Sequence, residues 1–455
     1  MVNKREAFGS RLAVIFAMAG SAIGLGNIWR FPYMIGEHGG STFVLLYIIS
    51  TLLVSLPVFI SEVVIGRRSR CNAKDAMASL SGGNSFWKKV GFLPILIPTI
   101  ITSYYSVIGG WSLEFFFKAC SLDFIRESPE SVGGIFGDFV SGTWTPVIMH
   151  VVFLLLCLVV VAGGVKSGIE KFSKATLPVL FILIVAIAVY SLCLPGSGEG
   201  MKYLFKLDFS QFTPRTFAYA MGQSFYSLSL GMGIIITYGS YIKKEENLIV
   251  SSAGTAVSDL LFALLAGVAI MPAVFAAGLE PGAGPGLIFQ SIPYIFTKMG
   301  VSVPFISAVV SIIFFLTIIV AAMTSCVSLI EVGVAYLVEK FNLRRGLACT
   351  ILFVLCGGLG ILCSLSFGPM KDVLIFDRTL FDFFDWLASN ILLLVMAFLA
   401  VVFVGFVLRK EAFADELSNG GTLKVNKALV STLFFLIKWV APVAVVLIFI
   451  TNFIL

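Results

Sequence analysis

The stretch AGSAIGLGNIWRFPY, residues 19–33, lies inside the first apolar segment that is long enough to cross a membrane. Glycine weakens a helix, and a charged side chain is costly in hydrocarbon. Gly24, Gly26, Asn27 and Arg30 nevertheless follow one another closely here. An unwound backbone at membrane depth is tolerated only where protein buries it or where it lines a cavity. The stretch therefore predicts a first span that is broken in the middle, with a function at the break.

The composition is typical of a membrane protein. Of the 455 residues, 58% are hydrophobic and only 12% are charged, which is far from the usage of a soluble domain. About eleven apolar runs are long enough to span the hydrocarbon core as helices. They cover residues 11–36, 41–66, 89–117, 145–162, 175–195, 212–239, 250–277, 304–337, 347–366, 375–408 and 430–454. We therefore expect an all-α integral membrane protein with about eleven transmembrane helices.

Lysine and arginine predict how the chain is oriented. They crowd the N-terminal residues and the second, fourth, sixth, eighth and tenth loops between the expected spans. By the positive-inside rule these segments face the cytoplasm. The N-terminus of a multi-pass protein of the cell inner membrane is then cytoplasmic, and its C-terminus lies outside. The net charge of +6 follows from this topology, so the expected partner is the lipid bilayer and not nucleic acid.

A second span contains the same kind of interruption. The segment SFYSLSLGMGIIITYGSY, residues 224–241, places Ser229, Gly231 and Gly233 inside the sixth apolar run. Interrupted segments at corresponding positions of two halves are typical of secondary transporters built from inverted repeats. We expect a first half over 1–195 with spans one to five and a second half over 196–408 with spans six to ten. A cytoplasmic loop and the eleventh span follow over 409–455.

The polar connections, about 118–143, 197–211, 278–303 and 409–428, are expected to be loops. Within the third, residues 279–296 combine a Gly/Pro turn with an apolar patch. That segment is either a re-entrant loop that dips toward the protein or a plain surface loop.

The chemistry of two broken helices suits a carboxylate and a cation. Free N–H groups at the start of a half-helix, with its dipole, attract a carboxylate. Free carbonyls, joined by oxygens of Asn27, Ser227, Thr324 and Ser325, suit a small hard cation. A substrate carboxylate could complete the cation's shell and couple the two binding events. An enzyme is not expected, because the two histidines are far apart and the eight cysteines show no metal-type or redox-type pair.

The chain resembles the neurotransmitter:sodium symporter family, which includes the bacterial leucine transporter. The resemblance covers nearly the whole chain, and its motifs occur in the family's order. They are AMAGSAIGLGNIWRFPY (17–33), ISEVVIGR (60–67), SYYSVIGGWSL (103–113), SGIEKFSKATLPVLFIL (167–183), GQSFYSLSLGMGIIITYGSY (222–241) and AAMTSCVSLIE (321–331). A twelfth span is missing, as in some bacterial members. The resemblance implies a five-plus-five inverted repeat and sodium-coupled symport of an amino acid into the cell by alternating access.

The same resemblance implies the binding residues. One sodium ion would be held by the substrate carboxylate together with Ala22, Asn27, Ser227 and Asp259. A second would be held by Gly20, Ile23, Ala321, Thr324 and Ser325. The substrate site would comprise Ala22, Gly24, Leu25, Gly26, Ile101, Tyr105, Tyr226, Ser227, Ser229, Met232, Ser325 and Leu329. In it the amides of Leu25 and Gly26 with the Tyr105 hydroxyl would hold the carboxylate, and Tyr226 would close over the pocket.

Three positions refine the expected substrate and coupling. Gly24 stands where monoamine carriers have an aspartate, so a substrate that brings its own carboxylate is favoured. Met232 replaces a phenylalanine of the leucine transporter, and a flexible thioether adapts to bulky apolar or aromatic side chains. Asp259 is an intramembrane carboxylate, which is by default functional. It would supply the negative charge that chloride brings in relatives, so we expect transport to be independent of chloride. A further hypothesis is that Asp259 takes up a proton on the return step.

The resemblance also implies two gates. Arg30 and Asp385 would form the outer gate, although Asp382 is an alternative to Asp385. Arg5 and Glu339 would form the cytoplasmic gate. Two other functions are compatible with broken helices, namely an ion channel and a substrate-sensing receptor on a transporter fold. Whether the protein forms a homodimer stays open.

Overall fold

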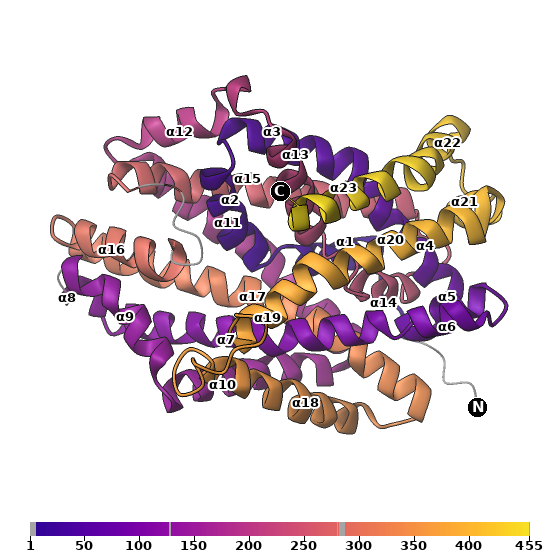
Figure 1. Cartoon of the computed structure of the whole chain (residues 1–455), viewed down its shortest axis with the longest axis horizontal. Helices are drawn as coiled ribbons and strands as arrows, with labels where there is room; N and C mark the ends of the chain where they lie inside the picture. The colour runs from indigo at the N-terminus through magenta and orange to yellow at the C-terminus, as the bar shows by residue number, and fades with distance from the viewer. Residues whose placement is uncertain (1–5, 127–128, 280, 282–286, 455) are drawn as a thin grey trace.

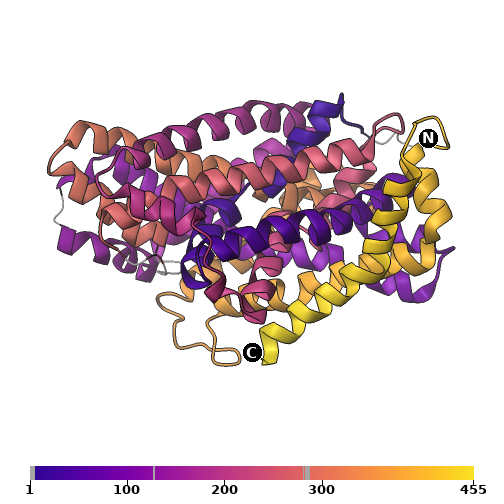
Figure 2. The same cartoon turned by 90° about the horizontal axis from the view of Figure 1, so that it is seen from above.

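A computed structural model describes residues 6–126, 129–279, 281 and 287–454, which form a bundle of helices (Figure 1). The long helices run along the longest axis of the molecule in two perpendicular views (Figures 1 and 2). Within the described chain, the one extended pairing is an isolated bridge between Ile375 and Arg378. The predicted all-helical class is confirmed.

Nine helical segments of the described chain are long and apolar enough to cross a bilayer. They are Ser41–Ser69, Ser85–Cys120, Trp144–Ala162, Val165–Leu192, Leu248–Ala276, Pro304–Phe341, Arg345–Leu365, Leu380–Ser418 and Lys427–Asn452. The main helices within them are α3 (Ser41–Ser50), α4 (Leu56–Ser69), α7 (Leu93–Cys120), α10 (Trp144–Ala162), α11 (Lys171–Leu192), α15 (Leu248–Ala276), α17 (Pro304–Phe341), α18 (Arg345–Leu365), α19 (Leu380–Leu387), α20 (Leu393–Val402) and α23 (Ala441–Ile454). Each of the nine overlaps one predicted run.

The first span is broken, as predicted. Its halves are α1 (Arg11–Ala22) and the π-helical turn η1 (Gly26–Arg30) with α2 (Phe31–Glu37), and they are bent by 52°. The helix α1 ends because Ile23 is extended, with φ −72° and ψ 102°. The break therefore falls in the glycine-rich part of residues 19–33.

The sixth span is broken as well. The helices α13 (Pro214–Ser227) and α14 (Ile234–Ser240) are separated by residues 228–233. Gly231 and Gly233 have φ angles of +75° and +74°. A Cβ at Gly231 would lie 2.3 Å from the carbonyl oxygen of Leu393, so conformation and close packing both require glycine there. With the broken first pair counted as one span, the described residues contain ten candidate spans. The predicted eleventh corresponds to α13 and α14, which are too short and too far apart in the chain to be counted as one continuous span.

The connections gather at the two ends of the bundle (Figure 1). At the left end of the view lie α8 (Asp123–Arg126), α9 (Pro129–Ser141), α12 (Ser197–Phe205) and α16 (Ile292–Gly300). At the right end lie α5 (Ala73–Leu80), α6 (Ser85–Val90), α21 (Arg409–Ser418) and α22 (Lys427–Phe435). The loops that the sequence analysis expects to carry the most positive charge thus include those at the right end.

The expectation of plain loops is wrong for much of the four polar connections, because each contains a short helix. Apolar residues one helical turn apart explain this. In α21, for example, Phe413 and Leu417 are both buried, and such spacing puts them on one face of a helix. Packing of that face stabilises a helix that would be marginal in isolation.

The segment 279–296 turns toward the protein. Its described part contains the π-helical turn η5 (Leu287–Ser291), in which Leu287, Ile288 and Phe289 are buried, and it leads into α16, which packs against α17. Residues 280 and 282–286 of the predicted re-entrant loop lie outside the described chain. Of the two alternatives, burial of the described part favours the re-entrant one.

The division into 1–195, 196–408 and 409–455 stays a prediction. The first two boundaries fall close to helix ends, since α11 ends at Leu192 and the π-helical turn η7 (Phe403–Leu408) ends at Leu408.

Candidate functional site

The two breaks lie against each other in the interior and border a small cavity. Ser229 of one break donates from Oγ to the carbonyl oxygen of Ser21 beside the other, at 2.9 Å. The cavity has a volume of about 20 Å³, which is room for about one water molecule. Its walls are Ser21, Ala22, Gly24, Gly26, Ile101, Tyr105, Tyr226, Ser229, Met232, Ile234, Ser325 and Leu329. A larger ligand therefore requires these side chains to move apart.

These walls contain the predicted substrate residues with two exceptions. Leu25 faces the cavity region through its backbone N–H, and Ser227 turns toward Asp259 instead. Two further wall residues were not predicted: Ser21, which adjoins Ala22, and Ile234, which lies two residues after Met232. Proximity to a break was the signal that could have found them.

One end of the cavity offers hydrogen-bond donors. The N–H of Leu25 donates to Tyr105 Oη at 3.3 Å, and the N–H of Gly24 donates to Asn27 Oδ1 at 3.2 Å. The half-helix that begins at Gly26 directs the positive end of its dipole to the same place. These groups suit a carboxylate.

A buried carboxylate lies beside the breaks. Asp259 of α15 is fully buried, and it accepts hydrogen bonds from Asn27 Nδ2 at 2.8 Å and from Ser227 Oγ at 2.7 Å. A cluster of oxygens with a negative charge is the environment that a small hard cation prefers. Asn27, Ser227 and Asp259 therefore lie together as the first predicted sodium site requires. Ala22 lines the adjacent cavity.

Tyr47 belongs to the same cluster and was missed by the sequence analysis. Its hydroxyl donates to Ser227 Oγ at 3.0 Å and to Asp259 Oδ2 at 3.4 Å. A tyrosine deep in an apolar span needs a partner for its hydroxyl. That need was the available signal, but it does not say which residue the partner is.

The residues of the second predicted sodium site meet where α1 ends against α17. Thr324 Oγ1 donates to the carbonyl oxygen of Ile23 at 3.2 Å and to that of Ala321 at 2.8 Å. Ser325 is buried beside Thr324, and a Cβ added to Gly20 would lie 3.8 Å from Thr324 Cβ. The extended backbone at Ile23 frees carbonyl groups there, so this place too is rich in oxygen ligands.

A vestibule of about 180 Å³, on the side predicted to face outward, lies on the other side of Tyr226, which borders both spaces. Arg30, Asp382 and Asp385 all line it. The Arg30 guanidinium lies 4.7 Å from the centre of the Tyr226 ring, which is within reach of a cation–π interaction. Tyr226 with Arg30 therefore separates the cavity from the vestibule.

The two aspartates of the vestibule differ in their surroundings. Asp382 Oδ2 accepts a hydrogen bond from Thr379 Oγ1 at 2.7 Å, at the start of α19. Asp385 accepts one from Ser389 Oγ at 3.2 Å and lies close enough to Arg30 to interact electrostatically. The arrangement favours Asp385 as the partner of Arg30.

The predicted cytoplasmic gate can be located in part. Arg5 lies outside the described residues. Glu339 of α17 accepts hydrogen bonds from the N–H and from Nδ2 of Asn72, at 2.7 and 2.9 Å. Its pairing with Arg5 stays a prediction.

An ionic cluster in the C-terminal part of α17 was not predicted from the sequence. Glu331 is fully buried; it forms an ion pair with Arg345 and accepts a hydrogen bond from Tyr241 Oη at 2.7 Å. The cluster therefore links Tyr241, the residue that follows α14, to α17 and α18.

The family of the chain follows from its similarity to known proteins. The family model described as the sodium:neurotransmitter symporter family matches residues 5–129 and 134–455. The chain belongs to the sodium:neurotransmitter symporter family. It is therefore a sodium-dependent transporter that crosses the membrane several times, and not an enzyme.

Individual family members resemble the chain over nearly its full length. An uncharacterized sodium-dependent transporter of Haemophilus influenzae is 35% identical, over 99% of this chain and 98% of the relative. The sodium-dependent transporter YhdH of Bacillus subtilis is 34% identical, over 98% and 97%. A solved structure of MhsT in complex with L-phenylalanine matches with a TM-score of 0.89 and 37% identity, over 99% of this chain and all of that one.

Proposed function

We propose that the protein carries an apolar or aromatic amino acid into the cell together with sodium, by alternating access at the two breaks. The observation that carries this proposal is the cavity, which has the donors of Leu25 and Tyr105 at one end and apolar side chains at the other. The carboxylate of the substrate binds to the donors of Leu25 and Tyr105, and the side chain of the substrate contacts Ile101, Met232 and Leu329. The complex of the similar MhsT with L-phenylalanine supports this class of substrate.

The amine of the substrate faces carbonyl groups near Ala22, Tyr226 and Ser229. One sodium ion binds beside Asp259 and a second beside Thr324, at the two oxygen-rich clusters. Because the Asp259 carboxylate provides a negative charge next to the first ion, transport needs no chloride.

Asp259 takes up a proton on the empty return step and releases it outside. Each transport cycle then exports one proton. A pH-sensitive dye inside proteoliposomes would report this export as a rise in internal pH during amino-acid uptake.

The outer gate closes when Arg30 and Asp385 approach each other over Tyr226. The inner gate combines the predicted pair of Arg5 and Glu339 with the Glu331 cluster. The N-terminus lies in the cytoplasm and the C-terminus outside, which agrees with the concentration of lysine and arginine in alternate loops.

An ion channel and a substrate-sensing receptor are the competing functions. A channel needs a continuous pore lined by groups that let ions pass. The buried side chains on both sides of the 20 Å³ cavity favour a transporter. A sensor would bind the same ligand without moving it, so binding and transport must be measured separately.

Binding of L-phenylalanine, L-tryptophan and L-leucine to the purified protein tests the site. Calorimetry in sodium chloride and in potassium chloride should give saturable binding in sodium only, because the first ion and the substrate carboxylate share a shell. Equal binding in both salts, or none in either, would refute the proposed coupling at this site.

We expect Tyr105→Phe to weaken binding of these amino acids about 10- to 100-fold. A hydrogen bond to a charged group contributes roughly 1.5–3 kcal/mol, and the variant removes one. Tyr104→Phe is the matched control, because Tyr104 of the same helix lines the outer vestibule instead. Calorimetry at a fixed sodium concentration measures both variants, and equal affinities would remove Tyr105 from the site.

We expect Met232→Phe to shift selectivity from tryptophan toward leucine about 10- to 100-fold. A bulkier and stiffer side chain leaves less room at the apolar end, and small changes in an apolar pocket alter discrimination by about 1–3 kcal/mol. Competition between the two amino acids in a single uptake assay measures the ratio, with leucine as the internal reference. An unchanged ratio would show that Met232 does not limit the size of the side chain.

A further inference from the structure

The inner end of α4 carries a buried arginine that the transport site does not use. Arg67 lies in the last turn of α4, and its side chain is 1% exposed. Burial of a guanidinium is costly unless its charge and its donors are all matched. The partners of Arg67 therefore show what this residue holds together.

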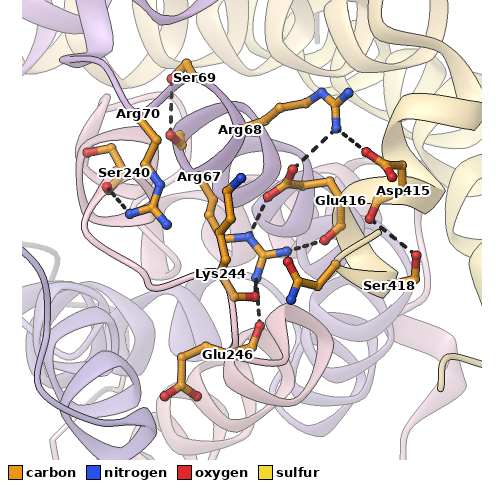
Figure 3. Close-up of polar contacts among 12 residues, drawn as sticks. Arg67, Arg68, Ser69, Arg70, Ser240, Lys244, Glu246, Asp415, Glu416 and Ser418 are labelled. Atoms are coloured by element: carbon orange, nitrogen blue, oxygen red, sulfur yellow. Dashed lines mark hydrogen bonds and ion pairs between the residues drawn. The ribbon is translucent and has the colours of Figure 1, made fainter. Parts of the chain in front are cut away.

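Arg67 joins three segments that are distant in the chain (Figure 3). Its Nε donates to Glu416 Oε1 at 2.6 Å, and one Nη donates to the Glu416 carbonyl oxygen. The other Nη donates to the carbonyl oxygen of Glu246 at 2.7 Å and, more weakly, to that of Lys244 at 3.4 Å. The helix α4, the connection from α14 to α15, and α21 thus meet at one side chain.

The helix α4 packs tightly against α14, the helix that precedes the second of these segments. A Cβ at Gly66 of α4 would lie 2.0 Å from the carbonyl oxygen of Ile236 in α14, and one at Gly239 of α14 would lie 2.8 Å from that of Val63. Backbones that approach so closely leave no space for sliding. The helices α4 and α14 therefore move together, and α14 is the inner half of the broken sixth span.

The third segment, α21, is bounded by conformational breaks. Arg409 at its start and Asn419 after its end both have positive φ, +66° and +49°, which only a few non-glycine residues adopt. At its C-terminal end the Glu416 carbonyl points to Arg67, where the helix dipole favours a cation. The helix α21 is thus attached to the α4–α14 unit at one end, and at the other end it follows η7 of the tenth span at Arg409, whose backbone is not helical.

We propose that Arg67 fixes α21 to the α4–α14 unit throughout the transport cycle, so that the tenth span flexes at Arg409 when the inner half of the sixth span moves. This inference rests on the proposed alternating-access function. Separation would leave the buried guanidinium without its carboxylate, which makes a permanent attachment more favourable than a contact that opens in every cycle.

A covalent link across the same contact tests the proposal. Arg68 Nη1 lies 2.8 Å from Asp415 Oδ2, and this ion pair is partly exposed beside Arg67 (Figure 3). Arg68→Cys and Asp415→Cys, joined by a short bis-methanethiosulfonate reagent, would tie α4 to α21 and leave Arg67 and Glu416 intact. The background should replace the three cysteines that are not buried in the described structure, Cys71, Cys120 and Cys193, by serine.

We expect the cross-linked protein to retain sodium-driven amino-acid uptake within about twofold of the reduced protein. Loss of uptake that a reductant restores would overturn the proposal, because the contact would then have to open. If the reduced double variant and its cysteine-substituted background both transport no amino acid, the proposed function fails and not the attachment.

Single variants provide an independent readout. Glu416→Ala leaves Arg67 without its carboxylate, and we expect the turnover rate to fall at least tenfold while the KM for substrate and sodium stays unchanged. Asp415→Ala is the matched control, with turnover within twofold of the unmodified protein. Equal turnover of the two variants, or a raised KM in Glu416→Ala, would contradict a role in movement.

Discussion

In chloride-free medium, Asp259→Ser is expected to lose about 100-fold or more of sodium-driven uptake, and added chloride is expected to restore most of it. The reason is the charge beside the first sodium ion. Two opposite charges 4 Å apart attract by roughly 4 kcal/mol at an effective dielectric constant of 20, which corresponds to about a 10³-fold change in binding. A serine leaves space and a hydroxyl for an anion at the same place. Uptake into proteoliposomes with chloride or gluconate as the anion measures the effect.

Tyr47→Phe is the matched control for this prediction. It removes one hydrogen bond to Asp259 but keeps the carboxylate, so its uptake should stay independent of chloride even if its rate falls. Chloride dependence in the unmodified protein would contradict the assignment of the negative charge to Asp259. So would an Asp259→Ser variant that binds sodium and substrate normally without chloride.

Gly24→Ala is expected to reduce amino-acid binding at least 100-fold. A Cβ at this position would lie 2.3 Å from Ser325 Oγ and 3.0 Å from Tyr105 Oη. The two hydroxyls would have to move, and they belong to the proposed second sodium site and to the end of the cavity proposed to bind the substrate carboxylate. Binding of L-phenylalanine in saturating sodium measures the loss.

Gly222→Ala serves as the control for Gly24→Ala. It lies in α13, where an added Cβ would meet Ile448 Cγ2 at 3.6 Å, an ordinary contact. That variant should bind like the unmodified protein, since alanine also favours the helix. Normal binding by Gly24→Ala would mean that this glycine does not border the substrate.

The two breaks could be predicted from sequence because their residues are costly in a membrane helix. Glycine, asparagine and serine within an apolar run have few explanations other than an unwound backbone that lines a cavity. The short helices α9, α12, α16 and α21 could not be predicted in the same way. Their signal is a few apolar residues at helical spacing among glycine and charges, and tertiary packing decides whether such a segment is helical.

The residues of the site came from the family resemblance, and the structure brings most of them together. The ionic contacts came from neither composition nor motif. Arg67 ends the motif ISEVVIGR and Arg345 lies in the eighth loop, but the positive-inside rule treats both only as positive charges near a membrane surface. Their carboxylate partners, Glu416 and Glu331, lie 349 and 14 residues away in the chain. Separations of either kind carry no pattern from which a pairing could be inferred.

Accumulation of labelled L-phenylalanine in proteoliposomes tests the central claim most directly. An inward tenfold sodium gradient with an inside-negative potential of about 100 mV supplies roughly 3.7 kcal/mol per ion. Two ions could concentrate a zwitterionic substrate about 10⁵-fold. Export of one proton per cycle at equal pH costs about 2.3 kcal/mol and lowers this limit to roughly 5 × 10³-fold, whereas one ion without a proton could reach about 500-fold. The account predicts accumulation above that single-ion limit, in sodium but not in potassium, and equally in chloride or gluconate. Sodium-dependent binding without accumulation in the same preparation would contradict symport and identify a substrate sensor instead.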